Sequence, residues 1–166
     1  MFYTIADDLI FYQLLSFVKR YSNFELKLRE YFYNKTEGIY PELIIIIDQF
    51  IFFFIKSENY FNSKKHIYSI RRDLANKKVL IIRFEKILIN LLFSFFPDVY
   101  IHDIKIDFNN NSIKKEISIY FLFIEERGIA IGRNGAYIKA VNKLFENYII
   151  FENKHVPLEI KCKVIV

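Results

Sequence analysis

The most distinctive stretch of the sequence is Gly132-Arg133-Asn134-Gly135, a motif that could hold phosphate. The chain of 166 residues contains only four glycines, and three of them (Gly128, Gly132 and Gly135) lie within eight positions. Glycine accepts positive φ and lets the backbone of a ligand lie against the main chain. A guanidinium at the tip of such a turn pairs well with phosphate. The spacing therefore indicates a tight turn that can contact a phosphodiester backbone.

The turn leads into a predicted helix over residues 136–147, whose N-terminus would attract phosphate through its unpaired N–H groups and its dipole. Ile131 and Ile138 flank the turn as candidate apolar groove residues, and Lys139 and Lys143 are candidate phosphate neighbours. Core packing of the isoleucines, a solvated lysine face and an ordinary Asn-Gly turn are the competing interpretations.

Hydrophobic periodicity predicts the elements that position the turn. Residues 79–96 contain a helix from about Arg83, which Pro97 ends. The elements that follow are a strand (99–108), a polar turn (109–112), a second strand (114–123), a short helix (126–132), the helix 136–147 and a last strand (148–153). In the second strand, alternation places Ile117, Ile119, Phe121 and Phe123 on one buried face. The order αββααβ predicts an α+β domain.

The N-terminal part is expected to form a small helical and β unit. Its predicted elements are helices over 5–21 and 24–33, the latter capped by Ser22 or Asn23, and strands over 42–48 and 49–56. Residues 57–78 show no sustained period and are interpreted as a basic connector with one short strand at most.

Charge is concentrated in two blocks, with net +6 over residues 63–90 and net +4 over residues 127–166. Such a distribution favours a surface that binds polyanions, although lysine enrichment through base composition is an equal alternative. The first block supplies a candidate electrostatic arm: Lys64, Lys65, Arg71, Arg72, Lys77 and Lys78.

Several function classes find no support in the sequence. The single Cys162 excludes an internal disulfide and is interpreted as a small buried hydrophobe, and the three histidines have no ligand spacing. Without a P-loop, a nucleophile–histidine pattern or a metal cluster, we expect no enzyme, no metal and no cofactor. The apolar run 43–55 is too short to span a membrane, so no membrane partner is expected.

The composition is rich in Ile, Phe, Tyr, Asn and Lys and poor in Gly, Ala and Pro, which indicates an AT-rich genome. The N-terminal stretch MFYTIADDL has neither a secretory nor a transit pattern. We therefore expect a protein of the plastid stroma, encoded in the organelle, or of a bacterial-type cytoplasm.

The stretch IAIGRNGAYIK, within its αββααβ surroundings, resembles a type II KH domain. In that family the GxxG loop clamps about four nucleotides of single-stranded RNA. The resemblance implies that residues 132–135 hold the RNA backbone. It implies further that Ile131 and Ile138 line the groove under the bases, while Lys139 and Lys143 lie near phosphates.

Residues 83–121 resemble the entry to the first KH domain of the transcription factor NusA, with a helix ending at Pro97-Asp98-Val99 and a basic lead into Ile119-Tyr120. Residues 24–56 resemble part of the NusA N-terminal domain, which contacts RNA polymerase. The resemblance implies an RNA-binding factor that acts in transcription elongation, termination or antitermination.

The predicted division is a polymerase-contacting unit (1–56), a basic connector or S1 remnant (57–83), and a KH domain with a C-terminal extension (84–166). The 57–83 segment is too short for the S1 barrel of NusA, and a second KH domain is not expected after the first. Alternatives are a KH protein of the ribosome resembling uS3, a stand-alone KH protein, and an interaction subunit that binds no RNA.

Overall fold

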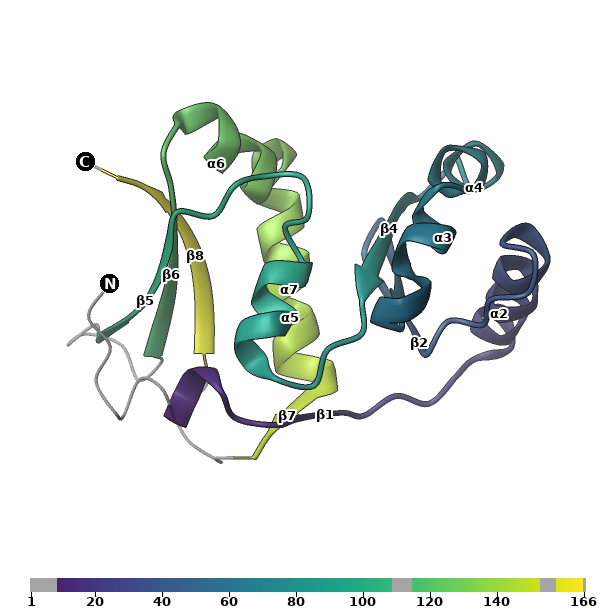
Figure 1. Cartoon of the computed structure of the whole chain (residues 1–166), viewed down its shortest axis with the longest axis horizontal. Coiled ribbons are helices and arrows are strands. Elements are labelled where there is room, and N and C mark those ends of the chain that lie inside the picture. The colour runs from purple at the N-terminus through teal and green to yellow at the C-terminus, as the bar shows by residue number, and fades with distance from the viewer. Residues whose placement is uncertain (1–8, 109–114, 153–157, 166) are drawn as a thin grey trace. The chain divides into compact units, whose positions relative to one another are not determined.

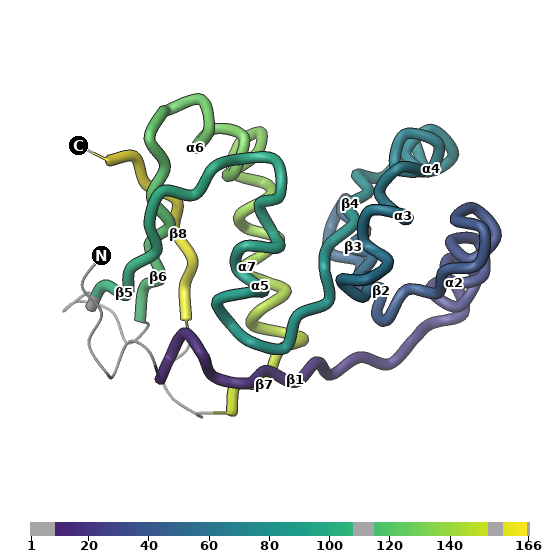
Figure 2. The backbone as a smooth tube through the Cα atoms, in the orientation of Figure 1, coloured from purple at the N-terminus to yellow at the C-terminus, as the bar shows by residue number. Residues whose placement is uncertain are grey.

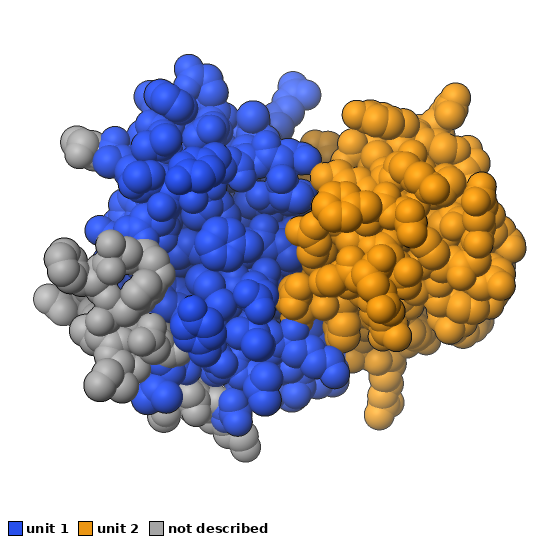
Figure 3. Space-filling model, viewed as in Figure 1, with its two compact units in different colours: residues 1–18, 86–166 blue, residues 19–85 orange. Residues whose placement is uncertain are grey.

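The computed structural model describes residues 9–108, 115–152 and 158–165. The chain divides into two compact units, one of residues 1–18 with 86–166 and one of residues 19–85 (Figure 3). We call them the split unit and the inner unit. The described elements of the inner unit are α2 (Asn23–Lys35), β2 (Leu43–Ile47), β3 (Phe50–Ile55), η1 (Ser57–Asn59), α3 (Tyr60–Lys64), α4 (Ile67–Asp73) and β4 (Lys78–Arg83) (Figure 1). Those of the split unit are β1 (Leu15–Phe17), α5 (Leu88–Ser94), β5 (Asp103–Phe108), β6 (Lys115–Phe121), α6 (Ile124–Ile131), η2 (Arg133–Gly135), α7 (Ala136–Tyr148), β7 (Ile149–Phe151) and β8 (Leu158–Val164).

The inner unit contains the sheet β2-β3-β4, in which β2 and β3 are antiparallel while β3 and β4 are parallel. The helix α2 begins as predicted, because the Ser22 hydroxyl accepts a hydrogen bond from the Glu25 N–H at 3.3 Å. A core of side chains from α2, α3, α4 and the sheet fills this unit, with Phe32 stacked on Phe53 at a centroid distance of 4.6 Å. The predicted strands at 42–48 and 49–56 are confirmed.

The split unit contains the sheet β5-β6-β8, in which β5 and β6 are antiparallel while β6 and β8 are parallel. The helices α5 and α7 lie along one face of this sheet (Figures 1 and 2). Ile117, Ile119 and Phe121 of β6 are fully buried on the helix side, as their alternation predicts. The α+β prediction and the αββααβ order are confirmed for this unit.

The other face of the β5-β6-β8 sheet carries a network of charged side chains. Glu116 pairs with Lys163 at 2.6 Å and with Lys161 at 3.1 Å, and the Ser118 hydroxyl donates to Asp107 at 2.7 Å. Hydrogen bonds from Lys163 hold the pKa of the Glu116 carboxyl below its ordinary value, against the opposing effect of desolvation. The central strand thus separates an apolar core from an ordered polar surface.

The two units share one topology. Each runs helix, strand, strand, helix, helix, strand, if β7, which pairs outside this sheet, is set aside. In each sheet the central strand has an antiparallel neighbour on one edge and a parallel neighbour on the other. In the inner unit the central strand β3 is followed by α3 and α4, and in the split unit the central strand β6 is followed by α6 and α7. The corner between α3 and α4 therefore occupies the same place in the fold as the glycine loop.

The interpretation of residues 57–78 as a connector is wrong. They contain η1, α3 and α4, and the strand β4 begins at Lys78. The run Val79–Ile82, which precedes the helix predicted from about Arg83, pairs with Ile51–Phe54 as part of the parallel strand β4. A short apolar run does not distinguish a buried strand from a buried helix, so its pairing partner decided its structure. The inner unit consequently extends to Glu85, beyond the predicted boundary at residue 56.

Two further predictions of local structure need correction. Within the predicted helix 5–21, only residues 9–11 of the described part are helical, and Leu15–Phe17 form β1 against β7. The predicted strand at 148–153 is confirmed as β7, but it is not the last one: it pairs with β1, while β8 follows it and completes the sheet beside β6. Both differences have one cause, since the partners of β1 and β7 are set by pairing between distant parts of the chain and not by local propensity.

Candidate nucleic-acid interface

The loop between α6 and α7 has the left-handed backbone that its residue types predict. Gly132, Asn134 and Gly135 have φ of 75°, 55° and 69°, respectively. The loop is closed by a hydrogen bond from the Gly135 N–H to the Gly132 carbonyl at 3.1 Å. Three positive φ values in four residues turn the chain sharply and leave its backbone near the surface.

Gly132 is required for a second reason, which is close packing. A Cβ at this position would lie 2.8 Å from Cβ of Tyr137 and 3.1 Å from its backbone nitrogen. Tyr137 is buried, and its hydroxyl donates to the carbonyl of Phe95, so the ring cannot move aside. A Cβ on Gly135 would make only an ordinary contact, with the Lys139 side chain, so this position requires glycine for its φ alone. Gly128 is an ordinary helical residue with nothing nearby, so only two of the three clustered glycines are required by the turn.

The helix α7 begins at the loop, with Gly135 at its N-cap and no side chain capping its first N–H groups. These donors and the positive end of the helix dipole remain available to a phosphate. Arg133 is exposed at the tip of the loop, and Lys139 is exposed one turn into the helix. The Lys139 Cε lies 3.9 Å from the position that a Cβ on Gly135 would occupy, so this side chain runs beside the loop. Lys143 is exposed one turn further along α7.

The apolar residues predicted beside the loop are placed where they can serve both packing and binding. Ile131 and Ile138 are half-buried, whereas Ala130, Ala140 and Val141 are buried and join the helices to the sheet. Half-buried side chains on both sides of a backbone turn offer an apolar strip beside its N–H groups. The eight predicted site residues of the split unit therefore belong to one loop and its two flanking helices.

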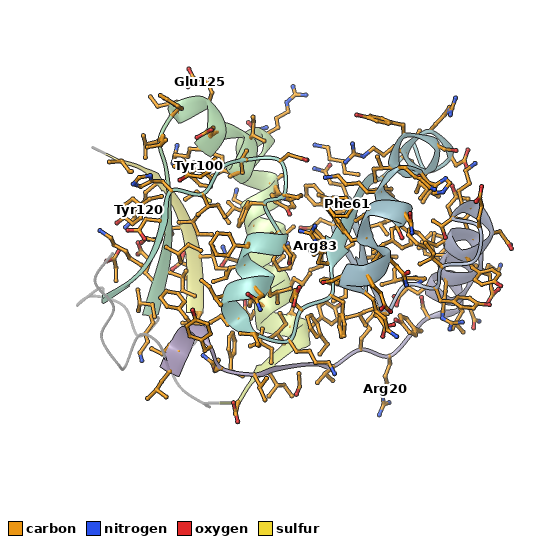
Figure 4. The ribbon with its side chains drawn as sticks, viewed as in Figure 1. Arg20, Phe61, Arg83, Tyr100, Tyr120 and Glu125 are labelled. Atoms are coloured by element: carbon orange, nitrogen blue, oxygen red, sulfur yellow. The ribbon has the colours of Figure 1, made fainter. Side chains whose placement is uncertain are left out.

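Sequence reasoning missed a group of exposed apolar residues at the start of α6. Phe123, predicted to be buried, is 61% exposed because it is the N-cap of α6, where the chain leaves the sheet. Ile124 and Ile129 on the same helix are 72% and 63% exposed. The sequence contained a signal for this exposure, because the alternation of apolar and polar residues in β6 ends at Phe121. Figure 4 labels Glu125, which lies on the same helix.

The residues of the predicted electrostatic arm do not form an extended arm. They belong to the folded inner unit and lie in, or next to, α3, α4 and β4. Arg71 donates to the carbonyl of Val79 at 3.2 Å, and Lys77 donates to the carbonyl of Asp48 at 3.0 Å. Within residues 9–108, 115–152 and 158–165, no group of three or more His, Cys, Asp or Glu side chains could hold a metal ion. No described helix is long and apolar enough to cross a membrane.

The fold and the glycine loop of the split unit are those expected of a KH domain, and comparison with known families agrees. Residues 99–165 match the family described as KH domain. A KH domain is therefore found in the C-terminal part of the chain. No curated protein matches the sequence.

Among solved structures, the chain is similar to one titled "Crystal structure of APE1850", with a TM-score of 0.57 and 18% sequence identity. The similarity covers 84% of this chain and 100% of that chain. At this level of identity the match supports the fold alone. It extends beyond the residues that match the KH family.

Proposed function

We propose that this protein is an RNA-binding transcription factor of the NusA type, which holds single-stranded nascent RNA in its glycine loop and contacts RNA polymerase. The observation that carries the RNA part is the KH domain at residues 99–165, whose loop combines three positive φ values with an uncapped helix N-terminus. A KH domain is an RNA-binding module and not a catalytic one, which fits a protein that is not an enzyme.

The loop would bind RNA through its backbone and its cations. Backbone N–H groups at the start of α7 would donate hydrogen bonds to a phosphate, and Arg133 and Lys139 would neutralise the neighbouring phosphates. Ile131 and Ile138 would contact the apolar faces of the bases. Because a clamp of about four nucleotides gives a modest affinity, tethering to polymerase would raise the local RNA concentration and make the contact effective.

The test of RNA binding is fluorescence anisotropy with a short labelled single-stranded RNA and the full chain. Arg133→Asp/Asn134→Asp places two carboxylates in the loop, and we expect a strong loss of affinity. Arg20→Asp/Asn23→Asp is the matched control, because it makes the same charge change at exposed positions of the inner unit. Equal effects of the two variants would mean that only net charge matters, and the loop would then not be the site.

Polymerase contact is supported by the NusA-like features of residues 83–121 and 24–56. We expect the tagged full chain to retain core RNA polymerase and to alter pausing or termination in a transcription assay. The ribosomal alternative predicts instead that the protein sediments with the small ribosomal subunit. Loss of polymerase retention together with such sedimentation would replace the transcription proposal by the ribosomal one.

The place of action that we propose, a plastid stroma or a bacterial-type cytoplasm, is supported by the AT-rich amino-acid usage. Fractionation of cells that express the protein, followed by immunodetection, would test it. Detection in a nuclear fraction would contradict this part of the proposal.

A further inference from the structure

The corner between α3 and α4 in the inner unit lacks the features of a backbone clamp. It contains Lys65 and His66 in place of the glycine motif. Their φ values are −61° and −93°, and no residue of this corner has a positive φ. The backbone therefore continues in a nearly helical path and exposes no turn of N–H groups. Any contact with a ligand must be made by side chains.

The side chains of α3 and α4 divide into two stripes at helical spacing. The inward stripe is Tyr60, Ser63, Ile67 and Ile70, all of which are buried. The outward stripe is Phe61, Lys65, Tyr68 and Arg72, all of which are exposed. Phe61 is 72% and Tyr68 77% exposed, the two highest values among the exposed aromatic residues that the structure describes. We call these four residues the aromatic–basic stripe.

Large aromatic rings so far exposed are unusual on a surface without a partner. The cations beside them decide what kind of partner fits. Residues 61–83 contain seven basic residues and one acidic residue, Asp73, which already pairs with Lys35 at 2.7 Å. In the part of the chain that the structure describes, neither Lys65 nor Arg72 has an ion pair, so both can pair with an external anion.

Arg83 of β4 adds a further charge and supports one of the rings. Its guanidinium lies 4.1 Å from the ring centroid of Tyr60 and 5.2 Å from that of Phe61 (Figure 4). This cation–π contact stabilises the Phe61 ring at the surface while one face stays open. Cations that alternate with open aromatic faces are the arrangement by which proteins bind single-stranded nucleic acid, since bases stack on the rings and phosphates pair with the cations.

We propose that the aromatic–basic stripe is a second binding site for single-stranded RNA, distinct from the glycine loop in place and in chemistry. Phe61 and Tyr68 stack bases, while Lys65 and Arg72 neutralise phosphates. Stacking is tolerant of base identity, so this site contributes affinity with little sequence preference. An acidic protein surface would use the cations but would not need two open rings, so RNA is the better-matched partner.

The test compares variants of the full chain by anisotropy with a labelled oligouridine of about 12 nucleotides, long enough for stacked binding. Phe61→Ala/Tyr68→Ala should weaken binding at least ~5-fold, the effect of losing one stacked base. Phe24→Ala/Tyr12→Ala is the matched control, because these rings are 53% and 65% exposed elsewhere on the chain. It should leave affinity unchanged.

Two further variants keep the result interpretable. Phe61→Tyr/Tyr68→Phe retains both rings and should bind like the wild type, which separates stacking from a general change in the surface. Lys65→Glu/Arg72→Glu should weaken binding and reduce its dependence on salt concentration. Circular dichroism would establish that all variants are folded.

The same pairs are then measured in the Arg133→Asp/Asn134→Asp background, which separates this proposal from the proposed function of the loop. Residual RNA binding that disappears with Phe61→Ala/Tyr68→Ala would support the second site. Loss of binding on Phe61→Ala/Tyr68→Ala would support the second site even if the loop substitutions had no effect on affinity and the loop proposal failed. Unchanged affinity of the aromatic variant in both backgrounds would overturn the proposal, and the stripe would then be a candidate protein-docking surface.

Discussion

Gly132→Ala should destabilise the protein more than Gly135→Ala, although both glycines have positive φ. A left-handed backbone costs a residue with a Cβ about 1–2 kcal/mol, and this cost applies to both positions. Gly132 carries an additional clash, since its Cβ would lie 2.8 Å from Cβ of Tyr137, and overpacking of this kind costs about 1–3 kcal/mol. Alanine restricts the unfolded chain and returns about 0.4–1 kcal/mol. We therefore expect a net loss of about 2–4 kcal/mol for Gly132→Ala and of about 1 kcal/mol for Gly135→Ala.

The assay is urea unfolding followed by circular dichroism, with the midpoint compared at constant slope. Gly128→Ala is the internal control, because this glycine is helical and has open space around it, so alanine should stabilise by about 0.5–1 kcal/mol. The expected order of stability is Gly128→Ala, wild type, Gly135→Ala, Gly132→Ala. If Gly132→Ala were as stable as Gly135→Ala, the close contact with Tyr137 would not exist as described, and the packing argument for the loop would be refuted.

Two further predictions concern the β5-β6-β8 sheet. Lys163 and Lys161 hold the pKa of Glu116 below its ordinary value of 4.5, so the carboxylate stabilises the fold above that pH and the contribution is lost as the pH falls through the lowered pKa. Wild type should therefore lose more stability between pH 6 and pH 3 than Glu116→Gln in urea titrations, and equal losses would contradict the role of this pair. Burial raises the pKa of the Cys162 thiol to about 12, so the native protein at pH 8 should resist a thiol reagent that modifies it in urea. Rapid native labelling would show that β8 is more accessible than described.

The sequence predicted the glycine loop and the elements next to it, because the information there is local. Glycine and asparagine specify positive φ wherever they occur together, and the alternation of Ile117, Ile119 and Phe121 identifies a half-buried strand without reference to its partner. The helix α2 was predicted for the same reason, since Ser22 caps it through a contact three residues away. The close approach of Tyr137 to Gly132 could not be predicted, because it depends on how α7 packs.

Only two strands of the inner unit's sheet, β2 and β3, were predicted. The third strand, β4, can be recognised only through its pairing with β3. The run Val79–Ile82 follows two short helices and precedes another, and only its parallel pairing with β3 distinguishes it as a strand. Because β4 was not predicted, the sequence did not indicate that the two units share one topology. The sequence did contain the spacing of Phe61, Lys65, Tyr68 and Arg72, but that pattern gains meaning only once residues 57–73 are known to be helical.

The central claim is that RNA lies on the glycine loop, and photo-crosslinking tests it most directly. Single-stranded RNA that contains 4-thiouridine would be bound to the full chain, irradiated, and the crosslinked peptides identified by mass spectrometry. The account predicts crosslinks within residues 128–139, which contain the loop and its flanking isoleucines, and their loss in Arg133→Asp/Asn134→Asp. Bound RNA that crosslinks elsewhere and never to this segment would contradict it.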